Sequence, residues 1–265
     1  MDARDFPRTA AVAGRMDVVD STGSTNADLV AAATAQPDAY PHLSVLMTDD
    51  QRAGRGRLDR VWEAPPGASL AVSVLVDVAG VPIAARGWIP LIAGAAMTLA
   101  VRAGAGARAE AVDVALKWPN DVLIDGYKVC GILAEVVTAR PGVIVIGAGV
   151  NTRMTRAQLP VPTATSLAIA GWGIDEDALV AAYLENLDRM LRRLTASSGD
   201  AEHAGIRAEI ARMCATIGRQ VTVSLPGGDD LRGTARDLDD DGLLLVDTAD
   251  GQTTAVAAGD VIHLR

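Results

Sequence analysis

The hydrophobic pattern changes abruptly after Gly218, and this change most limits the folds open to the chain. Upstream, apolar runs alternate with longer amphipathic segments. Downstream, the tight-turn sequences PGGDD, DDDG, ADG and AAGD separate five short β-type runs, which are 220–225, 231–238, 243–247, 253–257 and 261–264. Short strands joined by such turns predict a small β-barrel. We therefore expect two domains, residues 1–217 and residues 218–265.

The upstream domain mixes helices with hairpin-forming strands. The expected helices are 24–35, 90–103, 175–194 and 202–217. The expected strands are 43–48, 69–78, 115–118, 122–124, 128–137 and 142–150, and a connection covers 152–170. The Asp125-Gly126 pair predicts a hairpin turn. The pattern therefore indicates an α+β fold, in which helices and a mainly antiparallel sheet are mixed in one domain.

Composition excludes several classes of protein. The net charge of −9 argues against a broad surface for nucleic acid or an anionic membrane. The longest apolar run, 89–101, is too short to span a bilayer, and the first residues have no signal-peptide pattern. Cys130 and Cys214 have no metal-site spacing, so buried reduced thiols are expected. We expect a cytoplasmic protein that binds neither nucleic acid nor membrane.

Lysine is nearly absent from the chain. Of its 24 basic residues, only Lys117 and Lys128 are lysines, and both lie in the segment KWPNDVLIDGYK. An ammonium can approach a single oxygen closely, which the planar fork of arginine cannot do. A bias toward arginine that spared two lysines by accident is the alternative. The hairpin turn would bring Asp121 near Lys128, as a general base, a magnesium ligand or a surface ion pair.

The segment QRAGRGRLDRVW, residues 51–62, combines glycines with arginines. Glycines let backbone N–H groups approach an anion, and guanidinium groups bind phosphate or carboxylate in bidentate fashion. A solvated charged loop and an RNA-binding segment are the alternatives. The sequence Gly147-Ala148-Gly149 before Asn151 fits either nucleotide binding or close helix packing. Together these cations could bring a carboxylate and a triphosphate into contact.

These motifs resemble those of the biotin protein ligase family. The matching segments are Ser24-Thr25-Asn26, the arginine-rich segment, KWPND at 117–121, Lys128 with GILAE at 131–135, and GAGVN at 147–151. The resemblance implies a catalytic domain like those of class II aminoacyl-tRNA synthetases and lipoate ligases, with an SH3-like C-terminal barrel. It also implies that biotin and ATP give biotinyl-5′-AMP, and that biotin passes to a lysine of the biotin carboxyl carrier domain of an acyl-CoA or pyruvate carboxylase.

The resemblance also implies roles for individual residues. The biotin-binding set would be Ser24, Thr25, Asn26, Gln51, Arg55, Gly56, Arg57, Lys128, Gly131 and Leu133. The ATP-binding set would be Arg55, Arg57, Arg60, Trp62, Lys117, Asn120, Lys128 and Asn151. Lys128, Arg57 and Asp121 would be catalytic, with Asp121 as base for the carrier lysine. Mg²⁺ would accompany ATP without a dedicated metal site, although Asp121 could contact it.

Two departures from the family pattern matter. The family often has glycine where this chain has Asp59, although aspartate tolerates left-handed backbone. About 23 residues precede the first motif, too few for the DNA-binding domain of many relatives, so a ligase without a repressor role is expected. We also expect a monomer. A lipoate ligase, a biotin-dependent regulator and a non-catalytic biotin-binding module are the competing hypotheses.

Overall fold

The computed structural model describes residues 1–265 except 59, 107–111, 174, 226–227, 258 and 264–265. The described residues form a central seven-stranded sheet of order β1-β2-β5-β9-β8-β7-β6. Its strands are β1 (Arg15–Val18), β2 (Ser44–Thr48), β5 (Leu70–Asp77), β6 (Val114–Lys117), β7 (Asp121–Ile124), β8 (Tyr127–Val136) and β9 (Val143–Val150). Strands β1 and β2 are parallel, and the other neighbours are antiparallel. The expected α+β fold with a mainly antiparallel sheet is confirmed.

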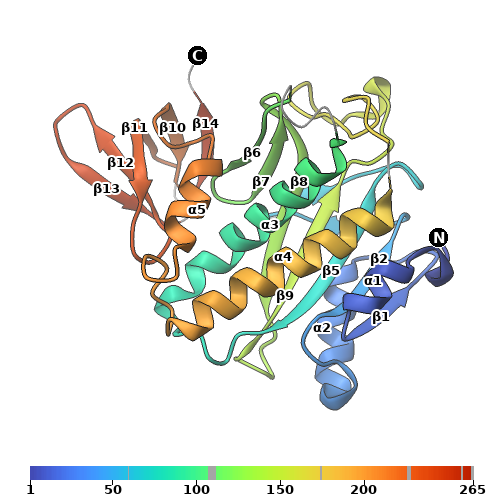
Figure 1. The fold of residues 1–265 in the computed structure, drawn as a ribbon. Helices are drawn as coiled ribbons and strands as arrows, with labels where there is room; N and C mark the ends of the chain where they lie inside the picture. The colour runs from blue at the N-terminus through green and yellow to red at the C-terminus, as the bar shows by residue number, and fades with distance from the viewer. Residues whose placement is uncertain (59, 107–111, 174, 226–227, 258, 264–265) are drawn as a thin grey trace.

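Helices cover both faces of this sheet. They are α1 (Pro7–Val12), α2 (Thr25–Ala35), α3 (Trp88–Gly104), α4 (Glu176–Ala196) and α5 (Ile206–Met213). Figure 1 shows α3 and α4 side by side across one face. Val45 and Met47 belong to the core on that side, whereas Leu46 packs with Leu29 of α2. Because neighbouring residues of a strand point to opposite faces, α2 lies on the other face.

The helix predictions are confirmed for α2, α3 and α4, but the predicted helix that corresponds to α5 is too long. Ser24 caps α2, and its hydroxyl accepts a hydrogen bond from the backbone N–H of Ala27 at 3.4 Å. The prediction of a helix over 202–217 is wrong at both ends, because α5 covers only Ile206–Met213. Gly205 precedes it with φ of 67°, a left-handed conformation that no α-helix contains.

The Asp125-Gly126 turn between β7 and β8 is confirmed. Asp125 has φ of 49° and Gly126 has φ of 80°. Two successive positive φ angles are typical of a type I′ turn, the connection whose twist matches that of a two-residue hairpin. The turn therefore fixes the register that places β7 against β8.

The C-terminal part forms a second sheet of five strands, as expected. They are β10 (Gln220–Ser224), β11 (Asp230–Leu238), β12 (Leu244–Thr248), β13 (Thr253–Val256) and β14 (Asp260–His263), in the order β13-β12-β11-β10-β14. All neighbouring pairs are antiparallel. The expected last strand included residue 264, which lies outside the described residues, as do 226–227 in the expected PGGDD turn.

This C-terminal sheet packs closely against the main domain, as Figure 1 shows beside α5. The indole N–H of Trp88 donates to the carbonyl of Asp240 at 2.7 Å, and that of Trp118 donates to the carbonyl of Gly242 at 3.4 Å. A Cβ on Gly87 would lie 2.3 Å from the carbonyl oxygen of Asp241. The turn between β11 and β12 is therefore inserted against the start of α3 and the residue that follows β6.

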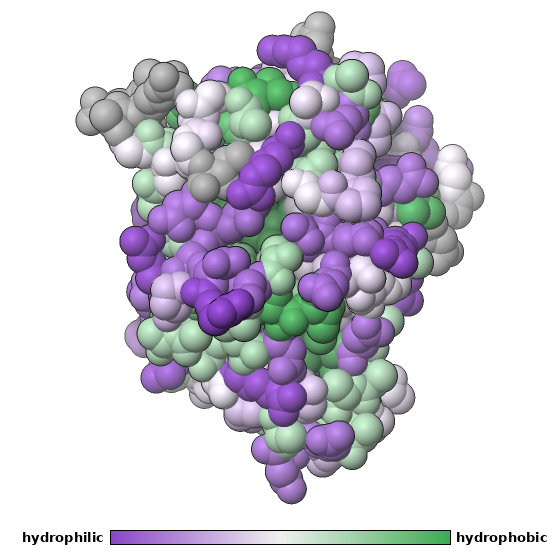
Figure 2. Space-filling view, turned by 90° about the vertical axis from the view of Figure 1, so that its right-hand side faces the viewer, coloured by the Kyte–Doolittle hydropathy of each residue, from purple (hydrophilic) through white to green (hydrophobic). Residues whose placement is uncertain are grey.

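Three further features concern the surface, an apolar helix and the two cysteines. Figure 2 shows that hydrophilic side chains cover most of one side of the molecule, with apolar residues in small areas between them. Among the described residues, one helical stretch, Ala84–Gly104, is long and apolar enough to cross a membrane, and 72% of the apolar window is buried inside the protein. Cys130 and Cys214 are free and buried, as expected.

Candidate active site

The central strands leave a hollow on the face that α2 partly covers. Ala71 of β5 lies opposite Gly149 of β9, and Gly149 lies opposite Gly131 of β8. The next row on this face, two residues along each strand, consists of Ser73, Gly147 and Leu133. Rows with so little side-chain volume cannot fill the space above them, and a cavity of about 140 Å³ lies there.

One wall of this cavity is a polar network at the start of α2. The backbone N–H of Thr25 donates to Oε1 of Gln51 at 2.9 Å, and the Thr25 hydroxyl donates to the same oxygen at 3.1 Å. The Ser73 hydroxyl lies 2.7 Å from the Thr25 hydroxyl and 2.6 Å from Oδ1 of Asn26, so its single proton is shared between two acceptors. Ser24 also lines the cavity. The structure thus brings together the four residues expected at one end of biotin.

The opposite wall is the arginine-rich segment, which is more ordered than the expected loop. It folds back as a two-stranded ribbon of β3 (Gly54–Arg55) and β4 (Val61–Trp62), in which Gly54 pairs with Trp62. A Cβ on Gly54 would lie 2.6 Å from the carbonyl oxygen of Trp62, so only glycine fits this close pairing. A loop was expected over these residues, and the pairing of β3 with β4 corrects that expectation. Asp59, the departure noted above, lies outside the described residues.

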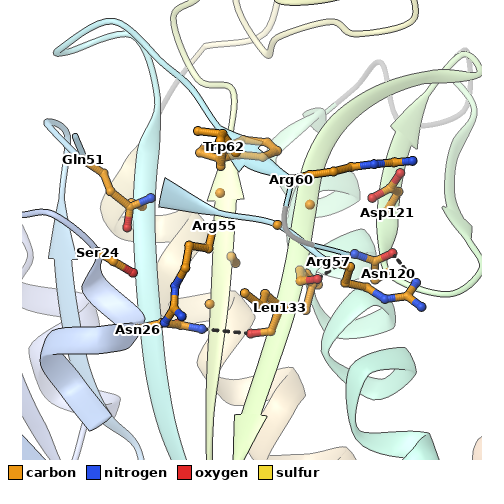
Figure 3. Close-up of a pocket in the computed structure, with 18 of the residues that line it drawn as sticks. Ser24, Asn26, Gln51, Arg55, Arg57, Arg60, Trp62, Asn120, Asp121 and Leu133 are labelled. Carbon is orange, nitrogen blue, oxygen red and sulfur yellow. Dashed lines mark hydrogen bonds between the residues drawn. The ribbon is translucent and has the colours of Figure 1, made fainter. Parts of the chain in front are cut away.

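Each of three arginines on this ribbon contacts a different part of the fold. Arg55 forms an ion pair with Glu135 of β8 at 3.0 Å. Arg57 donates to Oδ1 of Asn120 at 3.2 Å, and Arg60 contacts Asp260 of β14. Figure 3 shows Arg55 reaching toward Asn26, whereas Arg57 turns toward Asn120 and away from Asn26. All three arginines line one cavity together with Gly56, and the binding of an anion there remains a prediction.

Glycines on the floor make room for Trp62. A Cβ on Gly149 would lie 2.4 Å from Cε2 of Trp62, and one on Gly131 would lie 3.0 Å from Cζ3. A Cβ on Gly147 would lie 2.4 Å from Oδ1 of Asn26. Of the two interpretations of the Gly147-Ala148-Gly149 sequence, close packing of a helix is therefore right for Gly147. Gly149 instead receives an aromatic ring.

Lys128 and Asp121 meet across the hairpin, as expected. Nζ of Lys128 lies 2.6 Å from Oδ1 of Asp121 and 5.7 Å from the centre of the Trp62 ring. The backbone N–H of Lys128 donates to Thr163 at 2.8 Å, and its carbonyl accepts from Thr165 at 2.8 Å. The segment 152–170 thus fixes the backbone from which the lysine extends. Both members of the ion pair line the cavity.

Two expected ATP-binding residues do not line the cavity. Asn151 is 3% exposed, and its side-chain N–H donates to the carbonyl of Thr165 at 2.9 Å. Lys117 ends β6, which pairs with β7 at Asp121. Burial lowers the pKa of Lys117, which the charge of Asp121 partly opposes while Lys128 and Arg60 lower it further. Burial likewise lowers the pKa of Arg57, which still carries its charge at neutral pH.

The set of charged groups suits anions better than a metal ion. Arg55, Arg57, Arg60 and Lys128 converge on the cavity. The carboxylate of Asp121 is already paired with Lys128 at 2.6 Å. The described part of the chain holds no group of three or more His, Cys, Asp or Glu residues that could bind a metal. Arginine and lysine in a partly enclosed site can neutralise phosphate or carboxylate groups and stabilise negative charge that develops during a reaction.

Three residues of the site were missed by the sequence analysis. Ser73 contacts Thr25 and Asn26, Glu135 contacts Arg55, and Asp260 contacts Arg60. Glu135 stands at the end of the quoted sequence GILAE, so its position in a motif was the available signal. For Ser73 and Asp260 the sequence offers none, because their contacts depend on strand pairing and on docking of the second sheet.

A seven-stranded mainly antiparallel sheet, a cation-lined hollow beside α2 and a five-stranded C-terminal sheet define a ligase-type catalytic domain with an appended β-domain. Residues 18–151 match the model of the biotin/lipoate A/B protein ligase family, and residues 216–264 match the biotin protein ligase C terminal domain. The chain belongs to this ligase family.

Individual relatives agree with this assignment. The chain is 42% identical over 253 residues to a biotin–[acetyl-CoA-carboxylase] ligase of Mycobacterium tuberculosis, covering 95% of this chain and 90% of the relative. It is similar in fold to the biotin protein ligase of Aquifex aeolicus in complex with biotin and ATP, with a TM-score of 0.75, 22% identity, and coverage of 95% and 99%. The Leishmania major biotin protein ligase in complex with biotinyl-5-AMP gives a TM-score of 0.58, 25% identity, and coverage of 92% and 99%.

Proposed function

We propose that this protein activates biotin with ATP and transfers it to a lysine of a carboxylase carrier domain. The observation that carries the proposal is the convergence of three ribbon arginines and Lys128 on one hollow whose other wall is the polar network of α2. A carboxylate and a triphosphate repel each other, and such cations offset that repulsion in the transition state. The 42% identity to a biotin ligase over 95% of the chain supports the same reaction.

The first step would join two anions. An oxygen of the biotin carboxylate attacks the α-phosphorus of ATP, the bond from this phosphorus to the bridging oxygen breaks, and pyrophosphate leaves with the electron pair. Lys128 would contact both the carboxylate and the α-phosphate, and Arg57 would stabilise charge on the α-phosphate. Gln51 and the start of α2 would hold the ureido end of biotin, while Gly131 and Leu133 would line its tail.

The nucleotide would occupy the side of the cavity toward the C-terminal sheet. Arg60 and Trp62 would hold it together with Asn120, and Lys117 would support the phosphate end from outside the cavity. Arg55, expected to hold ATP as well as biotin, instead extends toward Asn26, so we assign it to biotin. Asn151 would accept a hydrogen bond from the adenine amino group through Oδ1, because its Nδ2 already donates to the carbonyl of Thr165. Its present contact fixes the segment that holds the backbone of Lys128.

The second step would transfer the biotinyl group. The amine of the carrier lysine attacks the acyl carbon, the acyl–phosphate bond breaks, AMP leaves, and one proton is lost from nitrogen. Asp121 is the proposed acceptor of this proton, because its carboxylate lines the cavity beside Lys128. Mg²⁺ would enter with ATP. The donor set does not fit a protein-held metal, and we derive no step from it.

The assembly around this reaction is also a proposal. The partner would be the biotin carboxyl carrier domain of an acyl-CoA or pyruvate carboxylase, with no part for nucleic acid or a membrane. Residues 1–217 would form the catalytic domain and residues 218–265 the SH3-like domain of a cytoplasmic monomer. A net charge of −9 argues against a broad basic surface for DNA.

Pyrophosphate release tests the proposal directly. Purified protein mixed with Mg-ATP should release pyrophosphate when biotin is added, and much less when lipoate is added at the same concentration. Transfer should then label a purified carrier domain at one lysine. Equal or greater release with lipoate would assign the chain to lipoate chemistry. Biotin binding without release would instead indicate a binding module, and tight biotin-dependent binding to operator DNA would indicate a regulator.

A further inference from the structure

Glu135 is the one carboxylate that connects the two walls of the cavity among the described residues. It lies on β8 in the third row of the sheet face, opposite Val145 of β9, which in turn lies opposite Leu75 of β5. Leu75 and Val145 pack beneath α2. Glu135 therefore stands where the hollow ends and the packed core beneath α2 begins.

The carboxylate of Glu135 has two partners. Oε2 accepts a hydrogen bond from the side-chain N–H of Asn26 at 2.7 Å, and one guanidinium nitrogen of Arg55 lies 3.0 Å from Oε1 and 3.4 Å from Oε2. Asn26 belongs to the wall formed by α2, and Arg55 belongs to the ribbon. Figure 3 shows the Arg55 side chain extending from the ribbon toward Asn26. One carboxylate thus joins two side chains, Asn26 and Arg55, that lie 29 positions apart in the sequence.

This carboxylate also fixes the orientation of the Asn26 amide. Its Nδ2 donates to Glu135 and to the carbonyl of Leu133 at 3.2 Å, and both partners can only accept. Oδ1 of Asn26 must then face Ser73, whose hydroxyl can donate to it at 2.6 Å. Without Glu135, Asn26 would lose its strongest acceptor, and Arg55, whose side chain is 53% exposed, would lose its one ion-pair partner in the described structure.

We propose that Glu135 is a positioning residue that closes the arginine ribbon over the end of the cavity where Asn26 lies. It does so by holding Asn26 and Arg55 at once, so that the ordered α2 wall and the closed ribbon stabilise each other. This inference rests on the proposed function only for the identity of the ligand, biotin. If so, neither Arg55 nor Glu135 contributes much to biotin affinity when the other side chain is removed.

The test is a double-mutant cycle read by isothermal titration with biotin alone. Arg55→Ala and Glu135→Ala should each weaken biotin binding by about tenfold or more, the scale for a lost charge-assisted hydrogen bond at a partly exposed site. The double variant should be no weaker than the worse single variant, because one interaction is lost in all three. The biotin affinity of Glu135→Gln should lie between those of the wild type and Glu135→Ala, because a glutamine oxygen can still accept a hydrogen bond from Asn26.

A matched control and a second measurement separate positioning from a general loss of structure. Arg52→Ala removes a neighbouring arginine whose partner is Asp50 at 2.8 Å, away from the cavity, and should leave biotin affinity within about twofold. Thermal unfolding of all variants should show equal midpoints within a few degrees. Additive losses in the double variant, or biotin affinity unchanged in Glu135→Ala, would overturn the inference.

This experiment also keeps the two proposals apart. If the wild-type protein bound biotin without releasing pyrophosphate, the ligase proposal would be wrong, but the double-mutant cycle could still be measured. Normal release together with additive losses would defeat only the role of Glu135. Absence of biotin binding by the wild-type protein would contradict both.

Discussion

The contact between Lys128 and Asp121 gives the sharpest prediction about chemistry. Lys128→Ala removes the ammonium that lies 2.6 Å from Asp121 and leaves a partly buried carboxylate without its cation. In the proposed reaction the same ammonium would neutralise both reacting anions. We expect kcat for biotin-dependent pyrophosphate release to fall by about 10² or more, equivalent to about 2.7 kcal/mol, the scale for removing one preorganised stabiliser of transition-state charge.

Lys128→Arg keeps the charge and tests whether shape matters. A Cβ on Gly131 would lie 3.1 Å from Nζ of Lys128 and 3.2 Å from Cε, so the lysine lies against bare glycine backbone. The Trp62 ring is 5.7 Å from the ammonium. A planar guanidinium is wider than an ammonium and needs a fork of acceptors. The kcat of the arginine variant should therefore lie within about tenfold of that of Lys128→Ala, on the same transition-state scale.

Lys117→Arg provides the comparison, because Lys117 belongs to the same segment but does not line the cavity. The kcat of this variant should fall by no more than about threefold, because the charge is kept at a position outside the cavity. The assay is continuous detection of pyrophosphate at saturating biotin and ATP. Wild-type turnover by Lys128→Arg would refute the reasoning, since charge alone would then suffice.

Four further outcomes are expected. Gly149→Ala would place a Cβ 2.4 Å from the Trp62 indole, and displacing that ring should raise KM for ATP by roughly tenfold, within the usual cost of overpacking. Arg57→Ala should speed the release of biotinyl-AMP from the protein by about tenfold or more with a smaller effect on free biotin, measurable by gel filtration. Asp121→Asn should slow transfer to the carrier by about 10² while adenylation changes little; the reverse pattern would exclude Asp121 as the base. Burial, reinforced by nearby cations, lowers the pKa of His263 from 6.5 to about 4. Between these values the unfolded chain binds more protons, so the free energy of unfolding should fall as pH drops through that window and stay level above it. Thermal unfolding of His263→Gln should show a weaker dependence on pH.

Much of the fold could be predicted because its signals are local. The polar cap at Ser24, the Asp125-Gly126 turn and the strand-like run that becomes β5 each act over a few residues. The length of α5 was overestimated because apolar periodicity continues past the point where Gly205 adopts a left-handed conformation. Strand β1 was not predicted, since four partly buried residues paired in parallel with β2 leave a weak pattern.

The site was predicted as a set of motifs but not as a set of contacts. Lys128 and Asp121 were expected to meet because one turn joins their strands, and they do. The partners of the ribbon arginines were not foreseen. Glu135 is 80 residues from Arg55, and Asp260 is 200 residues from Arg60. Contacts at that separation depend on strand order and on docking of the second sheet, which no local pattern encodes.

The hydrogen bonds of Trp118 have a consequence for the order in which the site is assembled during synthesis. Its backbone N–H donates to the hydroxyl of Thr216 at 3.1 Å and its indole to Gly242 at 3.4 Å, so residues made late hold the segment between β6 and β7. A chain emerging from the ribosome can form the polar wall around Asn26 once β9 is made. The nucleotide side of the cavity can form only after the C-terminal sheet has been made. A ribosome-stalled chain that exposes the whole main domain but not the last sheet should therefore be able to hold the ureido end of biotin before it can hold the nucleotide.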